Sequence, residues 1–200
     1  MKVLVVGSGG REHALAWKLK QSADVDEVIV APGNAGTHQE PGVRNVDIAA
    51  TDTVGLITLC QRENIEFTVV GPEVPLVAGI VDAFVEVNLA CFGPTANAAR
   101  LEGSKAFSKD FMQRYAIPTA AHQTFTDAAA AKVYVQSQGV PIVIKADGLA
   151  AGKGVIVAQT EMEAANAIDD MLSGNGFGEA GHRVVVEEFL PGEEASFICL

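Results

Sequence analysis

The chain has 200 residues, of which 48% are hydrophobic and 20% are charged, and its formal net charge is −11. This length and composition are sufficient for one or two folded domains with a buried core. The negative charge argues against nucleic acid as a partner, because binding to a phosphate backbone depends on clustered Lys and Arg. No stretch approaches the roughly 18 uninterrupted apolar residues of a membrane span, so we expect a cytoplasmic protein with no membrane partner.

Three cysteines, Cys60, Cys91 and Cys199, are spread widely along the chain in apolar surroundings. An odd number at such spacings does not suit a set of disulfides or a zinc site. We therefore interpret them as small hydrophobic side chains of the core.

The first hundred residues alternate short β-rich runs with helix-length segments. The expected strands are Val3–Val6, Val28–Ala31, Val46–Ile48, Phe67–Val70 and Ala90–Phe92. This alternation predicts an α/β fold with a doubly wound, mostly parallel sheet. The apolar spacing over Asp52–Asn64 predicts a covering helix after the cap candidate Thr51. Ligands of such sheets bind at the carboxyl ends of the strands, so the loops there are the places to search.

The pattern changes after Gly93 and Pro94, where helices are expected over Ala96–Leu101 and Ser104–Tyr115. Beyond Thr124 the pattern predicts a compact α+β unit. Its expected elements are helix Asp127–Gln138, strand Ile142–Ala146, strand Val155–Ala158, helix Glu161–Ser173 and strand Val184–Glu188. The final run Ala195–Leu200 is apolar and strand-like, and we expect the chain to end inside a further domain.

A glycine loop, Gly7–Gly10, follows the first expected strand and opens a helix. Its backbone N–H groups can face an anion beyond the strand end, and Arg11 can pair with a phosphate. A dinucleotide-binding fingerprint is the rival interpretation. It needs Gly or Ala where this chain has Glu12, and an acidic residue where this chain has Ala31-Pro32-Gly33. A tight turn without any ligand is a further alternative.

Two other strand ends carry loops rich in Gly and Pro, Pro32–Thr37 and Gly71–Leu76. Taken alone, each could be a simple turn. Because the carboxyl ends of parallel strands meet at one edge of a sheet, a pocket shared with the Gly9–Glu12 loop is the better interpretation.

A lysine, Lys145, interrupts an otherwise apolar strand. A buried, unpaired ammonium group is costly, so Lys145 should face either a bound anion or the carboxylate of a structural salt bridge. The loop that follows, Asp147–Gly154, contains three glycines that let backbone donors approach phosphate oxygens, and Lys153 adds a charge. It is not a Walker P-loop, because Gly154 stands where that motif needs Ser or Thr.

Two further segments are weaker signals. Lys105 opens a helix after Gly103-Ser104, and by itself it is an ordinary solvated residue. Glu187–Glu194 places carboxylates on both sides of apolar residues. Such a segment suits adenine, whose edge can be read by a backbone N–H and C=O while a carboxylate accepts from its amino group or from a ribose hydroxyl. A plain acidic turn is the alternative.

Seven short segments, in chain order, carry a resemblance to a known family. They are Gly7–His13, Ala31–Gly36, Val70–Glu73, Phe92–Thr95, Leu101–Lys105, Lys145–Gly154 and Glu187–Leu190. Together they resemble the ATP-grasp superfamily and, more closely, the glycinamide ribonucleotide synthetases. The resemblance covers all 200 residues, and no functional segment departs from the family pattern.

The resemblance implies an N-terminal pre-ATP-grasp domain with linker helices over 1–122, an ATP-grasp lid over 123–188 and the start of the ATP-grasp core over 189–200. It implies ATP contacts from Lys105, Lys145, Asp147, Gly148, Gly152, Lys153, Gly154, Glu187, Glu188, Phe189 and Leu190, with the ribose held by Glu194 or Glu193. It also implies that Gly9, Gly10, Arg11, Glu12, Pro32, Gly33, Asn34, Gly71, Pro72 and Glu73 face phosphoribosylamine.

The implied activity is the ATP-dependent ligation of glycine to phosphoribosylamine through glycyl phosphate, which belongs to purine biosynthesis. Mg²⁺ or Mn²⁺ would bridge the phosphates through ligands beyond Leu200, so we expect no metal ligand and no catalytic residue in this portion, which alone should be inactive. A monomer or weak homo-oligomer is expected. The alternatives are another ATP-grasp ligase such as a purine-pathway carboxylase subunit, an NAD-dependent dehydrogenase, or a nucleotide-sensing module without catalysis.

Overall fold

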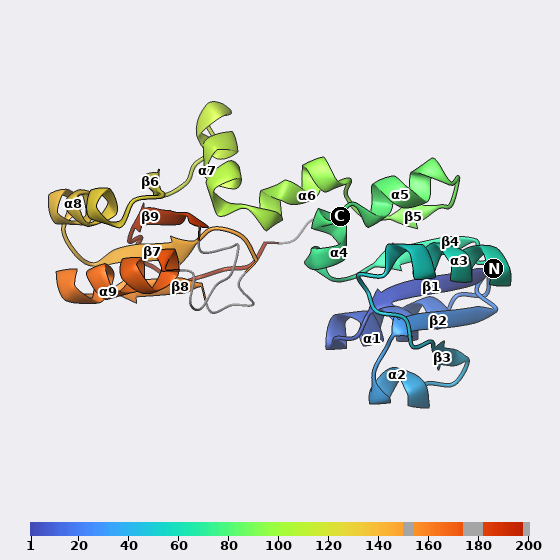
Figure 1. Ribbon diagram of the computed structural model, residues 1–200. Helices are drawn as coiled ribbons and strands as arrows, with labels where there is room; N and C mark the ends of the chain where they lie inside the picture. Colours follow the sequence, from blue (N-terminus) through green and yellow to red (C-terminus); the bar gives the residue numbers. More distant parts are fainter. Residues whose placement is uncertain (150–153, 174–181, 198–200) are drawn as a thin grey trace. The chain divides into compact units, whose positions relative to one another are not determined.

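The computed structural model describes residues 1–149, 154–173 and 182–197. The chain forms two compact units, Met1–Gly103 and Ser104–Leu200, which are coloured blue to green and green to red in Figure 1. In the described part, no helix has both the length and the apolar character needed to cross a membrane.

The first unit is built on a five-stranded parallel sheet with the order β3-β2-β1-β4-β5. Its elements are β1 (Lys2–Gly7), α1 (Gly10–Lys20), β2 (Glu27–Pro32), α2 (Ala35–Gln39), β3 (Val43–Asn45), α3 (Thr53–Glu63), β4 (Phe67–Val70), α4 (Glu73–Val77), α5 (Ile80–Glu86), β5 (Cys91–Phe92) and α6 (Ala96–Gly103). The predicted doubly wound parallel sheet is therefore confirmed.

The central strands of this sheet are buried on both faces. Leu4 and Val6 pack with residues of α3 and α5 in one core cluster, whereas Val3 and Val5 pack with Ala16 of α1 in another. Successive side chains of a strand point to opposite faces, so a nearly continuous apolar run fills both cores. Of the cysteines, Cys60 is buried and Cys91 is half-buried, and both are free thiols, as predicted; Cys199 lies outside the described residues.

Two local predictions in this unit are wrong. The third strand is Val43–Asn45, not Val46–Ile48. Val46 and Ile48 are apolar because they pack against the core from the loop that follows the strand. The cap of α3 is Asp52 and not Thr51, since the Asp52 carboxylate accepts a hydrogen bond from the backbone N–H of Gly55 at 2.9 Å.

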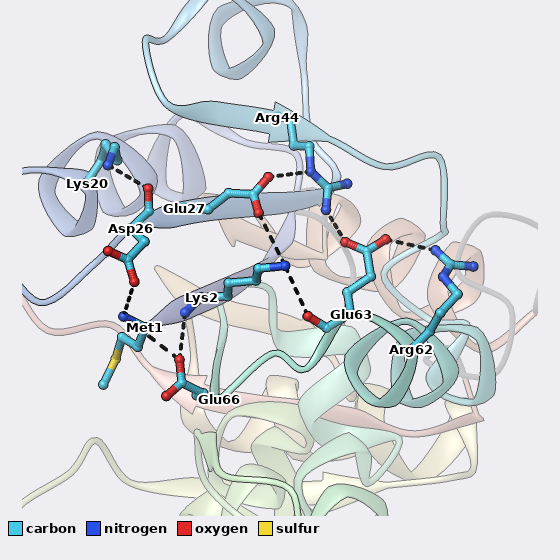
Figure 2. A network of polar contacts seen from close by, with 9 residues as sticks. All are labelled: Met1, Lys2, Lys20, Asp26, Glu27, Arg44, Arg62, Glu63 and Glu66. Atoms are coloured by element: carbon cyan, nitrogen blue, oxygen red, sulfur yellow. Dashed lines mark hydrogen bonds and ion pairs between the residues drawn. The ribbon is translucent and has the colours of Figure 1, made fainter.

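A network of ion pairs joins the elements of the first unit near the amino ends of its strands (Figure 2). Arg44 on β3 pairs with Glu27 on β2 at 2.6 Å and with Glu63 at the end of α3. Arg62 pairs with the second Glu63 oxygen at 2.9 Å. The hydrogen bonds from Arg62 and Arg44 lower the pKa of Glu63 below its ordinary value.

Replacing Glu63 by Gln is expected to lower the free energy of unfolding by about 1 kcal/mol at neutral pH. Because folding lowers the pKa of Glu63, its stabilising effect is present above the ordinary value of 4.5 and is lost as the pH falls through the lower folded value. Urea unfolding should show that the difference in free energy of unfolding between the wild type and Glu63→Gln becomes smaller at acidic pH. Glu86→Gln, at an exposed carboxylate of α5, should have little effect at either pH, and a Glu63 effect that did not depend on pH would contradict this assignment.

The second unit contains a four-stranded antiparallel sheet with the order β6-β9-β7-β8. Its elements are α7 (Lys105–Arg114), β6 (His122–Phe125), α8 (Ala128–Gln138), β7 (Ile142–Ala146), β8 (Val155–Ala158), α9 (Glu161–Leu172) and β9 (Val184–Glu188). Helices α8 and α9 pack on one face of this sheet, over Ile142, Ile144, Val184 and Val186. The α+β unit was predicted, but β6 was not. The described part of the predicted final strand, Ala195–Phe197, is not a strand.

The compact units divide between Gly103 and Ser104, among the linker helices that were predicted to close the segment 1–122. Helix α7 belongs with the second unit because its residues contact that unit. Ser104 and the backbone N–H of Ala106 donate to Asp147, and Lys109 pairs with Glu187. A separate lid over 123–188 and a core beginning at 189 stay predictions.

Candidate functional site

The three loops singled out in the first unit follow β1, β2 and β4, and each leads into a helix, α1, α2 or α4. The chain leaves β1 toward β2 and β3 on one side and returns to β4 on the other. This is a topological switch point, where open α/β sheets bind their ligands. We call the residues Gly9–Glu12 and Gly71–Glu73 the switch-point edge.

Glu12 is the buried centre of this edge, only 3% exposed. Its Oε2 accepts the backbone N–H of Gly9 at 2.7 Å, and its Oε1 accepts Nε of Arg11 at 2.9 Å. A Cβ atom added at Gly7 or Gly71 would overlap the Glu12 side chain, so these glycines provide the space it occupies. Glu12 stands where a dinucleotide fingerprint has its third glycine, which counts against the NAD interpretation.

Arg11 is fixed over the edge between two carboxylates. Besides its contact with Glu12, its Nη1 lies 3.2 Å from Oε1 of Glu73. The hydrogen bond to Glu12, and after it the one to Glu73, raises the pKa of Arg11. The pKa of Glu73 is lowered, first by its own backbone N–H and then by Arg11. Arg11 is therefore charged and oriented, and its side chain is still 56% exposed.

The loop after β2 is tied to the same edge through Asn34. Its Oδ1 accepts the N–H groups of Gly36 and Thr37 at 2.8 and 3.0 Å and so caps α2. Its Nδ2 donates to the carbonyl of Ser8 at 2.9 Å. Gly33 has a φ of +74°, and its N–H donates to the carbonyl of Gly7 at 3.1 Å. The structure thus brings together all three predicted loops, with Pro32 and Pro72 half-buried beside them.

Replacing Gly71 by Ala is expected to lower the free energy of unfolding by about 2 kcal/mol, because the added methyl group must displace the buried Glu12 carboxylate. Urea unfolding would measure the change. Gly10→Ala is the matched control, since nothing lies within 4 Å of a Cβ atom added there. Equal stability losses in the two variants would show that the space over Gly71 is not needed for Glu12.

The second unit gathers charge around one buried carboxylate, Glu187, which is 3% exposed. Lys145 of β7 lies 2.9 Å from its Oε2, and Lys109 of α7 lies 2.8 Å from the same oxygen. Lys109 also donates to Oγ1 of Thr119 at 2.7 Å. The other carboxylate oxygen, Oε1, is buried without a hydrogen-bond partner among the described residues. The salt bridge that the sequence left open for Lys145 is therefore present.

This cluster lies on the sheet face opposite α8 and α9, which we call the lysine face. Alternation along the strands puts Val143 and Lys145 of β7 and Glu187 of β9 there, and strand pairing adds Val155 and Val157 of β8. Val155 and Val157 are 46% and 44% exposed. Apolar side chains next to a partly exposed lysine suit a ligand with a flat ring and an anionic tail. These valines were not among the predicted site residues, although alternation along β7 and β8 predicts that they share the face of Lys145.

Asp147 fixes the start of the second glycine loop. Its carboxylate accepts from Ser104 Oγ at 3.0 Å, from the N–H of Ala106 at 3.1 Å and from Nη2 of Arg183 at 2.6 Å. Lys105 donates to the carbonyl of Gly148 at 2.7 Å. Asp147 is 6% exposed, so its carboxylate is engaged with the protein. Asp147 therefore holds the start of the loop next to the amino end of α7.

The structure does not gather the remaining predicted ATP-binding residues, among those it describes, at one place. Gly154 is buried and its carbonyl accepts the N–H of Ala146 at 2.8 Å, whereas Gly152 and Lys153 lie outside the described residues. Glu188 follows Glu187 in β9, so its side chain points to the other side of the sheet. Glu188 and Phe189 line a cavity of about 320 Å³ with Tyr134. Leu190, Glu193 and Glu194 are exposed.

A divalent metal was expected to be bound outside this portion. Among the residues that the structure describes, no group of three His, Cys, Asp or Glu side chains could hold a metal ion. We therefore derive no step through a metal.

Comparison with known families decides the assignment. Residues 1–102 match the family described as "Phosphoribosylglycinamide synthetase, N domain", and residues 103–200 match "Phosphoribosylglycinamide synthetase, ATP-grasp (A) domain". The chain belongs to the phosphoribosylglycinamide synthetase family. The family resemblance predicted from seven sequence segments is thus confirmed.

Individual relatives agree with this membership. The phosphoribosylamine–glycine ligase of Yersinia pestis is 64% identical over 200 residues, which are 100% of this chain and 47% of that protein. The crystal structure of the phosphoribosylamine–glycine ligase of Thermotoga maritima has a TM-score of 0.76 at 34% identity, over 96% of this chain and 45% of that one. The chain therefore spans about half the length of the curated relatives it matches.

A more distant neighbour shows how widely the fold is shared. The N5-carboxyaminoimidazole ribonucleotide synthetase of Thermotoga maritima has a TM-score of 0.68 at 20% identity, over 94% of this chain and 46% of that one. This likeness shows the fold alone. The structure confirms the predicted α/β class with a doubly wound parallel sheet, and it shows that the predicted α+β unit contains a separate antiparallel sheet.

Proposed function

We propose that this chain supplies the lid and the N-terminal domain of a phosphoribosylamine–glycine ligase, which joins glycine to phosphoribosylamine at the expense of ATP. The observation that carries the proposal is the lysine face: a sheet surface with exposed valines, a partly exposed Lys145 and a buried Glu187 that has one unsatisfied oxygen. The names of the relatives supply the substrates.

ATP fits the lysine face by its chemistry. The flat adenine ring can cover Val143, Val155 and Val157, and the exocyclic amino group is a donor for the unsatisfied Oε1 of Glu187. Burying an acceptor without a partner costs about 1–3 kcal/mol, which a ligand donor would recover. The phosphates then extend toward Lys145 and toward the glycine loop that starts at Asp147.

The other predicted ATP residues complete this proposal. Lys105 neutralises phosphate charge together with Lys145, and the Asp147–Gly154 segment, including Gly148, Gly152, Lys153 and Gly154, provides backbone donors. Glu188, Phe189 and Leu190 contribute their backbone to the adenine edge, since the Glu188 side chain faces the other side of the sheet. Glu193 or Glu194 accepts from the ribose hydroxyls.

The switch-point edge of the first unit is proposed to bind phosphoribosylamine. Arg11 offers a charged guanidinium, and the N–H groups at the start of α1 favour a phosphate. The buried Glu12 carboxylate holds the loop through its hydrogen bonds with Gly9 and Arg11, so its role is to position Gly9, Gly10 and Arg11. Gly71–Glu73 forms the other part of this edge, and the loop Pro32–Asn34 borders it.

The reaction proceeds in two steps. The glycine carboxylate attacks the γ-phosphorus of ATP, and the bond to ADP breaks. The amino group of phosphoribosylamine then attacks the carbonyl carbon of glycyl phosphate, phosphate leaves, and the amide forms after loss of a proton. The residues of this chain position the substrates and neutralise charge, which is the main contribution of a protein to phosphoryl transfer. Mg²⁺, when bound, would neutralise charge on the phosphates, and its ligands are expected in the remaining half of the relatives' length.

Release of ADP by the full-length protein tests this proposal. Glycine with phosphoribosylamine should release ADP, and omission of either should abolish the release. Bicarbonate with aminoimidazole ribonucleotide is the matched substrate pair of a related ATP-grasp ligase. ADP release with that pair alone would reject the substrates proposed here, and ATP binding without turnover with any pair would favour a nucleotide sensor.

A further inference from the structure

Lys109 is a buried cation that the sequence analysis did not connect with any site. It is 7% exposed as a residue, lies on α7 and reaches the buried Glu187. A fully buried lysine is uncommon unless it is paired, and here the pairing places two ammonium groups, from Lys109 and Lys145, on one carboxylate oxygen. Glu187 therefore has one more positive partner than its charge requires.

The two lysines differ in what holds them. Nζ of Lys109 lies 2.8 Å from Glu187 and donates to Thr119 at 2.7 Å, and its side chain is 9% exposed. Nζ of Lys145 lies 2.9 Å from the same Glu187 oxygen, and its side chain is 27% exposed. Lys109 is thus fixed on two sides, whereas Lys145 can be reached by a ligand.

A phosphate that accepts from the Lys145 ammonium group competes with Glu187 for its charge and draws it, at least in part, away from the carboxylate. If it were the sole counter-ion, its departure would leave a buried carboxylate without compensation, which costs about 3–5 kcal/mol when such pairs are broken. With Lys109 in place, Glu187 stays paired when Lys145 turns away. The cost of handing Lys145 to a phosphate is therefore reduced.

We propose that Lys109 is a positioning residue for nucleotide binding: it is the permanent counter-ion of Glu187 and so makes Lys145 available to the phosphates of ATP. The proposal rests on the function proposed above. Lys109 itself does not contact the nucleotide, because it is enclosed between Glu187 and Thr119.

Lys109→Met in the full-length protein tests this role, because it removes the charge and keeps an unbranched chain. The dissociation constant of ATP with magnesium, measured by calorimetry, should rise about tenfold, which corresponds to about 1.4 kcal/mol. Lys109→Arg should retain most of the affinity. Lys132→Met is the matched control, since Lys132 pairs with Asp169 between two helices of the same unit, away from the lysine face, and its affinity should be unchanged.

A double-mutant cycle with Lys145→Met separates positioning from direct contact. If Lys109 acts through Lys145, adding Lys109→Met to Lys145→Met should leave the affinity for ATP nearly as it is in the single Lys145 variant. Additive losses would show that Lys109 touches the nucleotide, and would overturn the proposal. Unchanged affinity in folded Lys109→Met would overturn it as well, by showing a structural role only.

Two further outcomes are distinguishable. Should Lys109→Met not fold, Lys109→Gln keeps a donor for Thr119 without the charge, and the same loss of affinity is expected from it. Failure of the wild-type protein and of Lys132→Met to bind ATP would reject the proposed function itself. ATP binding by the wild type, together with full affinity in the Lys109 variants, would reject the positioning role alone.

Discussion

Asp147→Ala is expected to lower the free energy of unfolding of the second unit by about 3 kcal/mol. The Asp147 carboxylate accepts hydrogen bonds from Ser104, from the backbone of Ala106 and from Arg183, and it is almost completely buried. Its removal leaves the buried Ala106 N–H without an acceptor and leaves the contact between Lys105 and the Gly148 carbonyl to hold the start of α7 against the glycine loop. Urea unfolding followed by circular dichroism would measure the loss.

Asp169→Ala is the matched control for this change. Asp169 also pairs with a cation, Lys132, at 2.7 Å, but its side chain is 54% exposed. Exposed ion pairs contribute about 0–1 kcal/mol, so the control should be close to the wild type. A loss at Asp147 no larger than that at Asp169 would contradict the central place given to Asp147 in this unit.

Lys145→Ala in the full-length protein is expected to reduce kcat/KM for ATP about 100-fold, the size of effect seen when one donor to a developing charge is removed. The free energy of unfolding should change little compared with this loss of activity, because Glu187 keeps its ion pair with Lys109. Steady-state kinetics and urea unfolding on the same preparations compare the two effects. The physical reason for the difference is that the fold needs one cation at Glu187, whereas the phosphates need a second.

Lys132→Ala serves as the control, since it removes a lysine from the same unit without touching the lysine face. Its kinetics should match those of the wild type. Unchanged kinetics in Lys145→Ala, accompanied by a clear loss of stability, would establish that the pair of Lys145 and Glu187 is structural and would withdraw Lys145 from the nucleotide site.

Several elements followed directly from local patterns. The strands Phe67–Val70, Ile142–Ala146, Val155–Ala158 and Val184–Glu188 have the predicted bounds, because short runs rich in β-branched residues carry a strong local signal. Strand β6 was missed because His122–Phe125 has a weak strand pattern. It is a strand because it pairs with β9, which lies far along the chain.

Some residues of the candidate site could likewise be predicted from local sequence patterns, whereas others depend on contacts between distant segments. A lysine within an apolar strand is visible in the sequence, so Lys145 was found, and the small residues of the two glycine loops were found for the same reason. Lys109 could not be found, because a lysine on a helix has the same local pattern whether it is solvated or buried. Its partner Glu187 became known only from the sheet register and the place of α7.

The sequence by itself determined the parallel sheet of the first unit, the α+β character of the second, the family membership and the loops to search, because periodicity and runs of small residues depend on neighbours in the chain. Only the tertiary structure decided that Glu12 lies buried against Gly7 and Gly71, and that two lysines share one carboxylate. Charge pairing and burial depend on distances between segments remote in the chain, and folding alone sets those distances.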